Sequence, residues 1–256
     1  MQEILIPSSV DSSLQPSLFF HPSPGKNVPL VVGLHTWSFD RFNQQNTYLP
    51  LCQQYGWALL LPEFRGPNLQ SNPIAKLACG STTARQDIFD AIHAVCRDHA
   101  IDTGNIFLLG CSGGGHMALL AAADQPHTFR AVDVWCPVTD LHAWYSTLIS
   151  TQHSYPAHIA ACLGGTPQEV PEEYRSRSPQ FRADDLAKLP VRLHHGRHDD
   201  LVPFQNTAAL AAAIELAGSN QIYPDIFDGG HEQIPSQSFD WFARLARQSN
   251  AITITG

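Results

Sequence analysis

The sequence lacks the features that mark membrane-spanning and nucleic-acid-binding chains. No apolar run approaches the roughly 18 residues that a transmembrane helix needs, so we expect no membrane span. No cluster of basic residues is present and the formal net charge is −8, so we expect no nucleic-acid partner. Hydrophobic residues make up 43% of the 256 residues and charged ones 15%, which excludes disorder by composition and provides for a substantial core.

The sequence also has little that suggests secretion or disulfide bonding. Residues 1–7 have neither the basic start nor the long apolar stretch of a signal peptide. The six cysteines are scattered singly, without a Cys-x-x-Cys pair, and several lie in apolar segments, where free cysteine behaves as a small hydrophobe. We therefore expect reduced cysteines and a cytoplasmic location.

What is present is an alternation of strands and helices. Residues 1–17 are polar and give little signal, and Thr83 is a candidate cap for the helix that follows it. We expect strands at residues 18–22, 29–35, 56–62, 106–109, 129–137, 191–196 and 221–227, and helices at residues 41–55, 83–98, 204–216 and 239–247. This spacing predicts a single α/β domain over residues 1–256, with a mostly parallel sheet covered on both faces.

One segment, residues 139–189, interrupts the alternation. It is rich in aromatic residues and proline, and we expect a mostly helical insertion lying over the active end of the sheet. Trp144 and Tyr145, with Tyr155, would then suit an aromatic or sugar group of a substrate. The plain alternative is a pair of connecting helices whose aromatic residues only pack.

A candidate nucleophile lies between a buried strand and an alanine-rich helix. Residues 110–114 read Gly-Cys-Ser-Gly-Gly, a Gly-x-Ser-x-Gly turn that would lift the Ser112 hydroxyl above the end of the sheet. Side chains two residues before or after the serine would collide with neighbouring backbone, so glycine fits there. The alternative is a glycine-rich turn that merely joins strand to helix.

Partners for this serine follow two later strands, at the edge where parallel sheets carry their functional loops. Asp199 is the candidate acid, with Asp200 as an alternative, because a carboxylate there can orient an imidazole. His231, behind two glycines after the last strand, is the candidate base. The chain order Ser112, Asp199, His231 is the order expected for this scaffold.

An oxyanion site needs two backbone N–H donors. One should be the N–H of Gly113, and the other should come from the loop after the 29–35 strand, where we prefer Trp37 to Thr36. A metal site is not expected, because the candidate ligands His194, His195 and His198 lie across a strand end and a turn. No cofactor is expected either.

The sequence resembles the α/β-hydrolase fold, and more narrowly the catalytic domain of prolyl-oligopeptidase-type and acylaminoacyl-peptidase-type hydrolases and their esterase relatives. The matching motifs lie between residues 30 and 245: residues 110–116 (Gly-Cys-Ser-Gly-Gly-Gly-His), 163–167 (Leu-Gly-Gly-Thr-Pro), 174–179 (Tyr-Arg-Ser-Arg-Ser-Pro) and 195–203 (His-Gly-Arg-His-Asp-Asp-Leu-Val-Pro). The resemblance implies Ser112 as nucleophile, Asp199 as acid and His231 as base.

The sequence departs from the large peptidases of this type. It contains no propeller segment, and it has His-Thr-Trp at residues 35–37 where many relatives have a glycine-rich oxyanion loop. Single-domain relatives are often carboxylesterases, including ones that remove acetyl or feruloyl groups from plant polysaccharides. We therefore expect a serine esterase acting on a small-molecule ester. A peptidase or amidase, and a non-catalytic binding protein on the hydrolase scaffold, are the alternatives.

Overall fold

Eight strands form one sheet in the computed structural model, which describes residues 1–253 and their side chains as far as residue 247. The strand order is β1-β2-β4-β3-β5-β6-β7-β8, with β2 antiparallel to both its neighbours and the other pairs parallel. The strands are β1 Gln2–Pro7, β2 Leu14–Phe20, β3 Val28–Leu34, β4 Ala58–Pro62, β5 Ile101–Cys111, β6 Ala131–Trp135, β7 Val191–Gly196 and β8 Ile222–Phe227. The expected mostly parallel sheet is confirmed.

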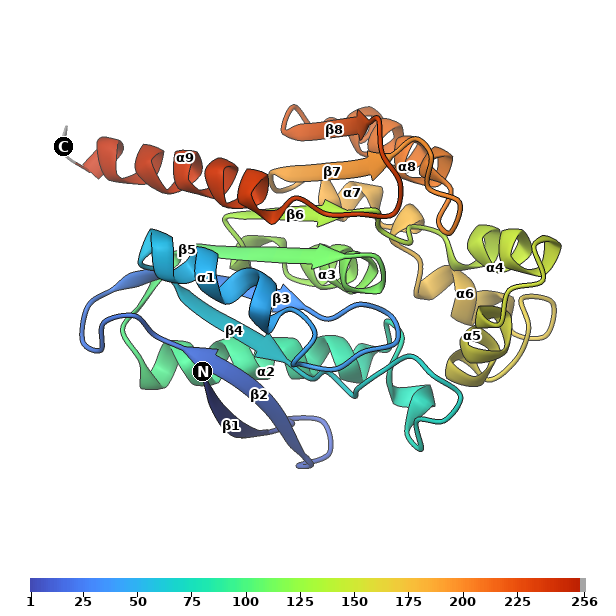
Figure 1. Ribbon diagram of the computed structural model, residues 1–256, viewed down its shortest axis with the longest axis horizontal. Helices are drawn as coiled ribbons and strands as arrows, with labels where there is room; N and C mark the ends of the chain where they lie inside the picture. The colour runs from blue at the N-terminus through green and yellow to red at the C-terminus, as the bar shows by residue number, and fades with distance from the viewer. Residues whose placement is uncertain (254–256) are drawn as a thin grey trace.

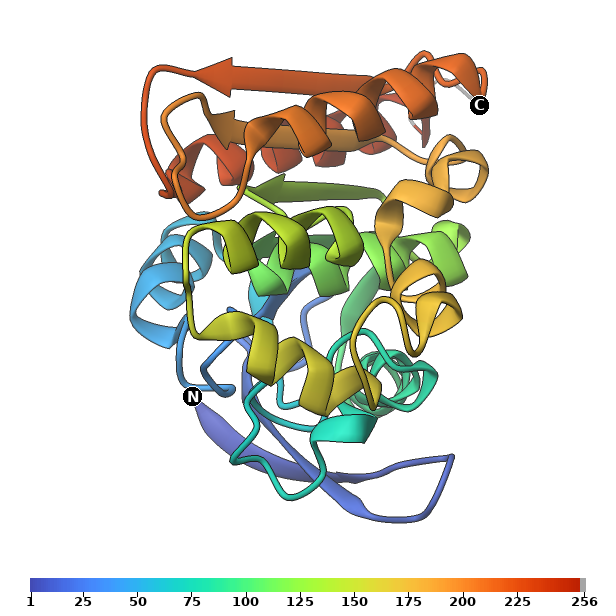
Figure 2. The same cartoon turned by 90° about the vertical axis from the view of Figure 1, so that its right-hand side faces the viewer.

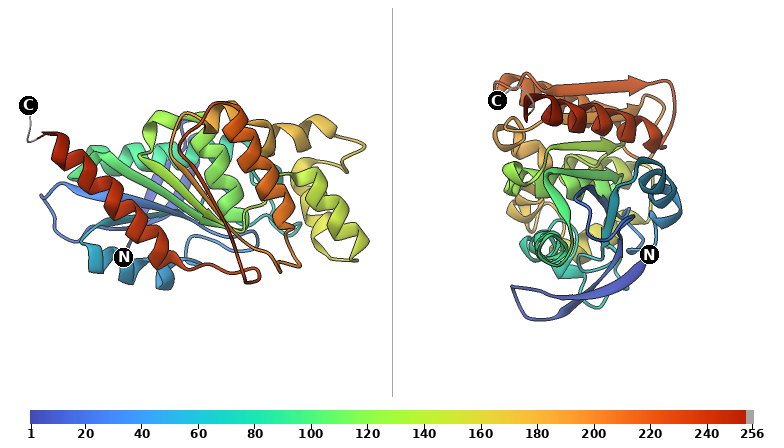
Figure 3. Two further views of the ribbon diagram at one scale, coloured as in Figure 1. Left: turned by 90° about the horizontal axis from the view of Figure 1, so that it is seen from above. Right: turned by 90° about the vertical axis from the view of Figure 1, so that its left-hand side faces the viewer.

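Helices cover both faces of this sheet (Figure 1). In the left panel of Figure 3, α1 and α9 lie on one side, and α3 and α8 on the other. The helices are α1 Gln45–Tyr55, α2 Thr82–Asp98, α3 Gly113–Asp124, α4 Leu141–Ser150, α5 Tyr155–Leu163, α6 Pro171–Ser176, α7 Ala183–Leu186, α8 Phe204–Leu216 and α9 Pro235–Thr253, with short 3₁₀ helices at Ala75–Leu77, Pro126–Thr128 and Pro179–Phe181. Within residues 1–253, none of these helices is both long and apolar enough to cross a membrane.

Strands β3 and β4 and the second half of β5 are almost entirely apolar because they face a core on each side of the sheet. On β3, Leu30 and Val32 pack toward α2 and α3, while Val31 packs on the other face against α1. Phe107 of β5 joins that second core, together with Phe242 of α9. Strands buried on both faces read as continuous hydrophobic runs, which is why these strands are visible in the sequence.

The segment 139–189 forms α4 to α7 and, as expected, lies at the carboxyl ends of the strands (Figure 2). Its helices α4, α5 and α6 share a separate core around Trp144. One hydrogen bond attaches the segment to helix α3, and another joins two distant residues within the segment. The His116 ring nitrogen Nε2 lies 2.6 Å from the Arg177 carbonyl oxygen, and the Leu141 N–H donates to the Ser178 hydroxyl.

Several local expectations differ from the structure. The strands expected at residues 18–22 and 106–109 are Leu14–Phe20 and Ile101–Cys111, and the closing helix begins at Pro235 rather than at residue 239. Strand β1 was not expected, because it is an edge strand with only Ile6 buried and so shows little hydrophobic pattern. The cap of α2 is Ser81, whose hydroxyl accepts the Ala84 N–H, and Thr83 lies inside the helix. The expected helix at residues 41–55 begins only at Gln45, because the chain first makes a hydrogen-bonded turn at Asp40.

Candidate active site

Ser112 lies at a sharp turn between the last residue of β5 and the first residue of α3. Its backbone angles are φ 55° and ψ −121°, a conformation that a non-glycine residue adopts only when its surroundings enforce it. A Cβ atom on Gly110 would lie 2.3 Å from the Gly114 oxygen, and one on Gly114 would lie 2.5 Å from the Leu34 oxygen. The two glycines of the motif are therefore required by close backbone packing, as expected.

Asp199 and His231 are brought together across 32 positions of sequence. The His231 nitrogen Nδ1 lies 2.6 Å from Asp199 Oδ2. The other carboxylate oxygen, Oδ1, accepts the backbone N–H groups of Leu201 and Val202 at 3.0 and 2.9 Å. Asp200, the alternative acid, is exposed.

These hydrogen bonds keep the Asp199 carboxyl group ionised. Burial by itself raises its pKa, but the donors from His195, His231 and Val202 outweigh burial and hold the pKa well below its usual range. The charged carboxylate can then accept a hydrogen bond from the Nδ1–H group of His231, which leaves Nε2 of that ring as the basic nitrogen.

Hydrogen bonds hold the loop that carries His231 at the residues before and after this histidine. The Cys136 sulfur lies 3.7 and 3.5 Å from the carbonyl oxygens of Gly230 and Glu232, which share its single S–H donor. The buried Tyr48 hydroxyl donates to the Gln233 amide oxygen at 2.9 Å. The end of β6 and helix α1 therefore hold the loop that follows β8.

Ser112 and His231 line the same surface hollow, with a volume of about 280 Å³. Their two side chains form no hydrogen bond with each other in this structure, and such contacts commonly tighten only when substrate binds. The full lining is Thr36, Trp37, Ser38, Phe39, Cys111, Ser112, Tyr155, Leu201, His231, Glu232 and Gln233. A larger hollow of about 530 Å³, between β1 and α2, contains none of the predicted site residues.

The backbones of Gly113 and Trp37 meet beside Ser112. A Cβ atom on Gly113 would lie only 2.7 Å from the Trp37 backbone nitrogen, so a side chain there would force the two apart. The Thr36 N–H already donates to the Asn43 side-chain oxygen at 2.9 Å. The Trp37 N–H has no acceptor in the described part of the chain, and the Gly113 N–H belongs to the unpaired first turn of α3.

The structure does not bring Trp144 and Tyr145 to the hollow. Trp144 is buried in the core of the 139–189 segment, where its indole N–H donates to the Leu201 carbonyl oxygen, and Tyr145 packs edge-on against Tyr174. Both serve as packing residues here, and we do not carry them forward as substrate contacts. Tyr155 and the exposed Phe39 line the hollow instead, and no periodicity in the sequence distinguished Phe39.

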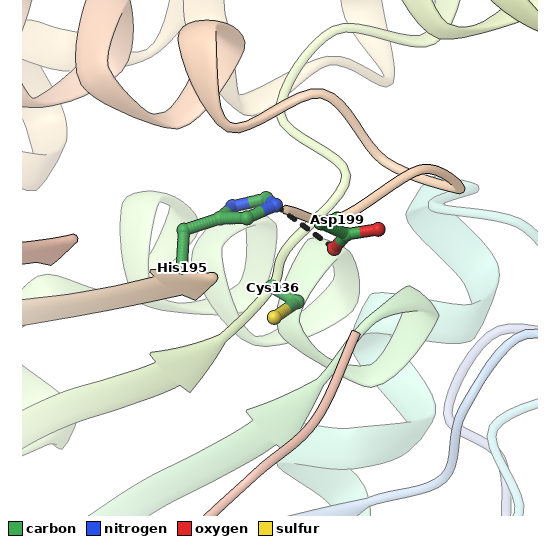
Figure 4. A group of neighbouring side chains, drawn as sticks. All are labelled: Cys136, His195 and Asp199. Carbon is green, nitrogen blue, oxygen red and sulfur yellow. Dashed lines mark hydrogen bonds and ion pairs between the residues drawn. The ribbon is translucent and has the colours of Figure 1, made fainter. Parts of the chain in front are cut away.

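The three neighbouring histidines are separated by the fold. His194 is stacked under Trp135, and His198 is exposed and pairs with Asp228. His195 lies beside Cys136 and Asp199, with one donor atom from each residue within 4.8 Å of the others (Figure 4). Burial raises the pKa of the Cys136 thiol to about 11, and the Asp199 oxygens already accept hydrogen bonds, so we propose no metal at this cluster.

Known proteins resemble this chain over most of its length. A model of the prolyl oligopeptidase family matches residues 49–248. "Uncharacterized peptidase YtmA" of Bacillus subtilis is 29% identical over 126 residues, which are 49% of this chain and 47% of that protein. Acetylxylan esterase A of Aspergillus oryzae is 21% identical over 200 residues, which are 76% of this chain and 64% of that protein.

Among solved structures, the acylaminoacyl peptidase of Pyrococcus horikoshii has a TM-score of 0.72 at 21% sequence identity. The likeness covers 96% of this chain and 39% of that one, and it shows the α/β-hydrolase fold. The chain spans less than two thirds of the length of each of these three proteins. Because the family model covers most of the sequence, the chain belongs to the prolyl oligopeptidase family of serine hydrolases.

Proposed function

We propose that the protein is a serine hydrolase that cleaves carboxylic esters, with Ser112, His231 and Asp199 as its catalytic residues. The observation that carries the proposal is the 2.6 Å contact between His231 Nδ1 and Asp199 Oδ2, beside a hollow that Ser112 shares. A serine in a strained turn, a histidine and a buried carboxylate are the three parts that acyl transfer through a covalent intermediate requires.

In the proposed mechanism, His231 Nε2 accepts the Ser112 proton as the serine oxygen attacks the ester carbonyl. Asp199 holds the imidazole in the Nδ1–H tautomer and stabilises the imidazolium that forms. The N–H groups of Gly113 and Trp37 donate to the carbonyl oxygen as it becomes negative. The imidazolium then protonates the departing alcohol, and a water molecule activated by His231 releases the acid from Ser112.

The lining of the hollow supports an uncharged substrate with an apolar part. Trp37, Phe39 and Tyr155 supply aromatic surface, and Leu201 adds aliphatic surface. No lysine or arginine is among the lining residues, and Glu232 is the single carboxylate there. An ester needs no charged group to hold it, whereas an aminopeptidase needs acidic residues to bind the free amine of its substrate. The likeness to an acetylxylan esterase agrees with this assignment.

The alternative is a peptidase or amidase acting on short peptides. It is supported by the likeness to the YtmA peptidase and to the acylaminoacyl peptidase structure. The same catalytic residues would serve either reaction, because both proceed through an acyl-enzyme. Only the leaving group differs.

The test compares p-nitrophenyl esters, from acetate to octanoate, with an aminoacyl p-nitroanilide. We expect turnover of the esters and none above background for the anilide. Turnover of the anilide alone would contradict the esterase proposal and assign the protein to the peptidases. Turnover of neither, together with failure of a serine-reactive phosphonate to label the protein, would favour a non-catalytic binding scaffold.

A further inference from the structure

A second imidazole contacts the carboxylate of Asp199. His195, at the end of β7, is fully buried, and its nitrogen Nε2 lies 3.1 Å from Asp199 Oδ2 and 2.8 Å from the Val202 carbonyl oxygen. Its other nitrogen, Nδ1, lies 2.8 Å from the Thr207 hydroxyl in the first turn of α8. The mechanism above uses neither His195 nor Thr207.

The hydrogen-bond partners fix the tautomer of this ring. A carboxylate and a carbonyl oxygen are both acceptors, so His195 Nε2 must carry a hydrogen to contact them. Within the described part of the chain, His195 Nδ1 is the only side-chain hydrogen-bond partner of the buried Thr207 hydroxyl. The hydroxyl therefore donates to Nδ1, and the ring is held as the Nε2–H tautomer.

We propose that His195, with its tautomer set by Thr207, is a positioning residue. It orients the Asp199 carboxylate toward His231 and keeps that carboxylate ionised. The proposal rests on the function proposed above. Asp199 accepts four N–H donors, and Oδ2 is shared by the imidazoles of His195 and His231. With His195 in place, the carboxylate cannot rotate without breaking a buried hydrogen bond, so Oδ2 stays aimed at His231 Nδ1.

The same contact controls the proton affinity of the Asp199–His231 pair. The titratable side chains that face Asp199 are His195 from β7, His231 from the loop after β8, and the thiols of Cys136 after β6 and Cys111 at the end of β5. The His195 N–H stabilises the charged carboxylate, so its removal makes the pair bind a proton more tightly. The acid limb of the pH–rate profile must then move to higher pH.

The first test compares His195→Phe, which removes the donor, with His195→Gln, whose amide nitrogen stands where Nε2 was. For His195→Phe we expect kcat to fall roughly 10- to 100-fold, KM to stay within about twofold, and the acid limb to rise by about half a pH unit or more. His195→Gln should recover most of the lost kcat and return the acid limb close to its wild-type position. A folded His195→Phe protein with an unmoved acid limb, or no recovery in His195→Gln, would overturn the proposal.

Because His195→Phe can fail to fold, Thr207 provides a second pair of variants. Thr207→Val removes the hydroxyl at nearly constant volume, and Thr207→Ser keeps it. We expect Thr207→Val to shift the acid limb in the same direction by a smaller amount, and Thr207→Ser to match the wild type. Equal profiles for the two variants would contradict a role for the hydroxyl in fixing the ring.

A readout without substrate separates this proposal from the proposed function. In ¹⁵N-histidine NMR of the wild-type protein, the His195 resonances are identified by their absence from the His195→Gln spectrum. We expect Nε2 protonated and Nδ1 unprotonated, and a protonated Nδ1 would overturn the inference. If the tautomer is as expected but the wild type cleaves no ester, the proposed function has failed and the hydrogen-bond arrangement has not.

Discussion

At the scale of single residues, the site depends on contacts that cross long stretches of sequence. Ser112, Asp199 and His231 come from three separate turns, and the last two meet at 2.6 Å. Motif spacing predicted these three residues, because each follows a strand at the same edge of the sheet. It left Asp200 as an alternative to Asp199, because the two residues are adjacent in one loop and differ only in the direction that their side chains take.

The choice between the two carboxylates gives a direct prediction. Asp199→Asn keeps the shape of the side chain but removes the charge that holds the Nδ1–H tautomer of His231, so kcat should fall on the order of 10⁴-fold. Asp200 is exposed, and Asp200→Asn should stay within about twofold of wild type. Steady-state kinetics on one p-nitrophenyl ester checks both variants. A large loss in Asp200→Asn with a small one in Asp199→Asn would reverse the assignment.

The oxyanion donors show a similar limit of sequence reasoning. Thr36 and Trp37 are adjacent, and either could supply an N–H by position alone. The Asn43 side chain, seven residues away, accepts the Thr36 N–H, and this contact favours Trp37. Trp144 and Tyr145 were expected at the substrate for their chemistry, but a large aromatic ring fills a core equally well.

At the scale of elements, helix α3 joins the site to the 139–189 segment. The helix begins at the turn of Ser112, and one turn later its His116 contacts the Arg177 carbonyl oxygen across 61 residues. The Arg177 guanidinium in turn donates to the carbonyl oxygens of Ala78 and Cys79. The motif at residues 174–179, which carried part of the family resemblance, therefore serves to attach this segment beside the site.

This attachment predicts a pH dependence of stability. Burial lowers the pKa of His116 from 6.5 to about 4, against the opposing hydrogen bond to Arg177. Between these pH values the unfolded chain binds more protons than the folded one, so the free energy of unfolding should decrease as pH falls from 6.5 to 4, by about 3 kcal/mol. In His116→Gln this contribution should be absent.

Urea unfolding at several pH values between 4 and 7 checks the prediction. The stability of His116→Gln should fall less steeply toward pH 4 than that of the wild type. His93 is exposed on α2, so His93→Gln should keep the wild-type slope and serves as the matched control. Identical slopes for all three proteins would show that His116 does not titrate with unfolding in this range.

The elements themselves were predictable where both strand faces are buried or a helix follows a clear pattern. Helix α8 lies where the alanine-rich run at residues 204–216 predicted it. Strand β1 could not be predicted, because its position depends on backbone pairing with β2 and its side chains are mostly exposed. The local sequence pattern predicts which residues are buried well, but it predicts poorly which strands pair through their backbones.

At the scale of the whole molecule, the sheet brings the three site loops to one edge. The 139–189 segment also lies at the carboxyl ends of the strands, while the hairpin of β1 and β2 forms one lateral edge of the sheet, at the bottom of Figure 1 (Figures 1 and 2). The larger hollow beside this hairpin lies away from every predicted catalytic residue. Size alone would select the larger hollow, whereas the residues that line the smaller one support our proposal that it is the active site.

The measurement that tests the central claim most directly is covalent labelling of Ser112 together with ester turnover. Wild type and Ser112→Ala are incubated with a serine-reactive phosphonate and with p-nitrophenyl acetate, and Ser176→Ala, which changes an exposed serine, is the control. We expect one phosphonate on Ser112 by peptide mass spectrometry, and loss of both labelling and turnover only in Ser112→Ala. Ester turnover by Ser112→Ala at the wild-type rate would contradict the account.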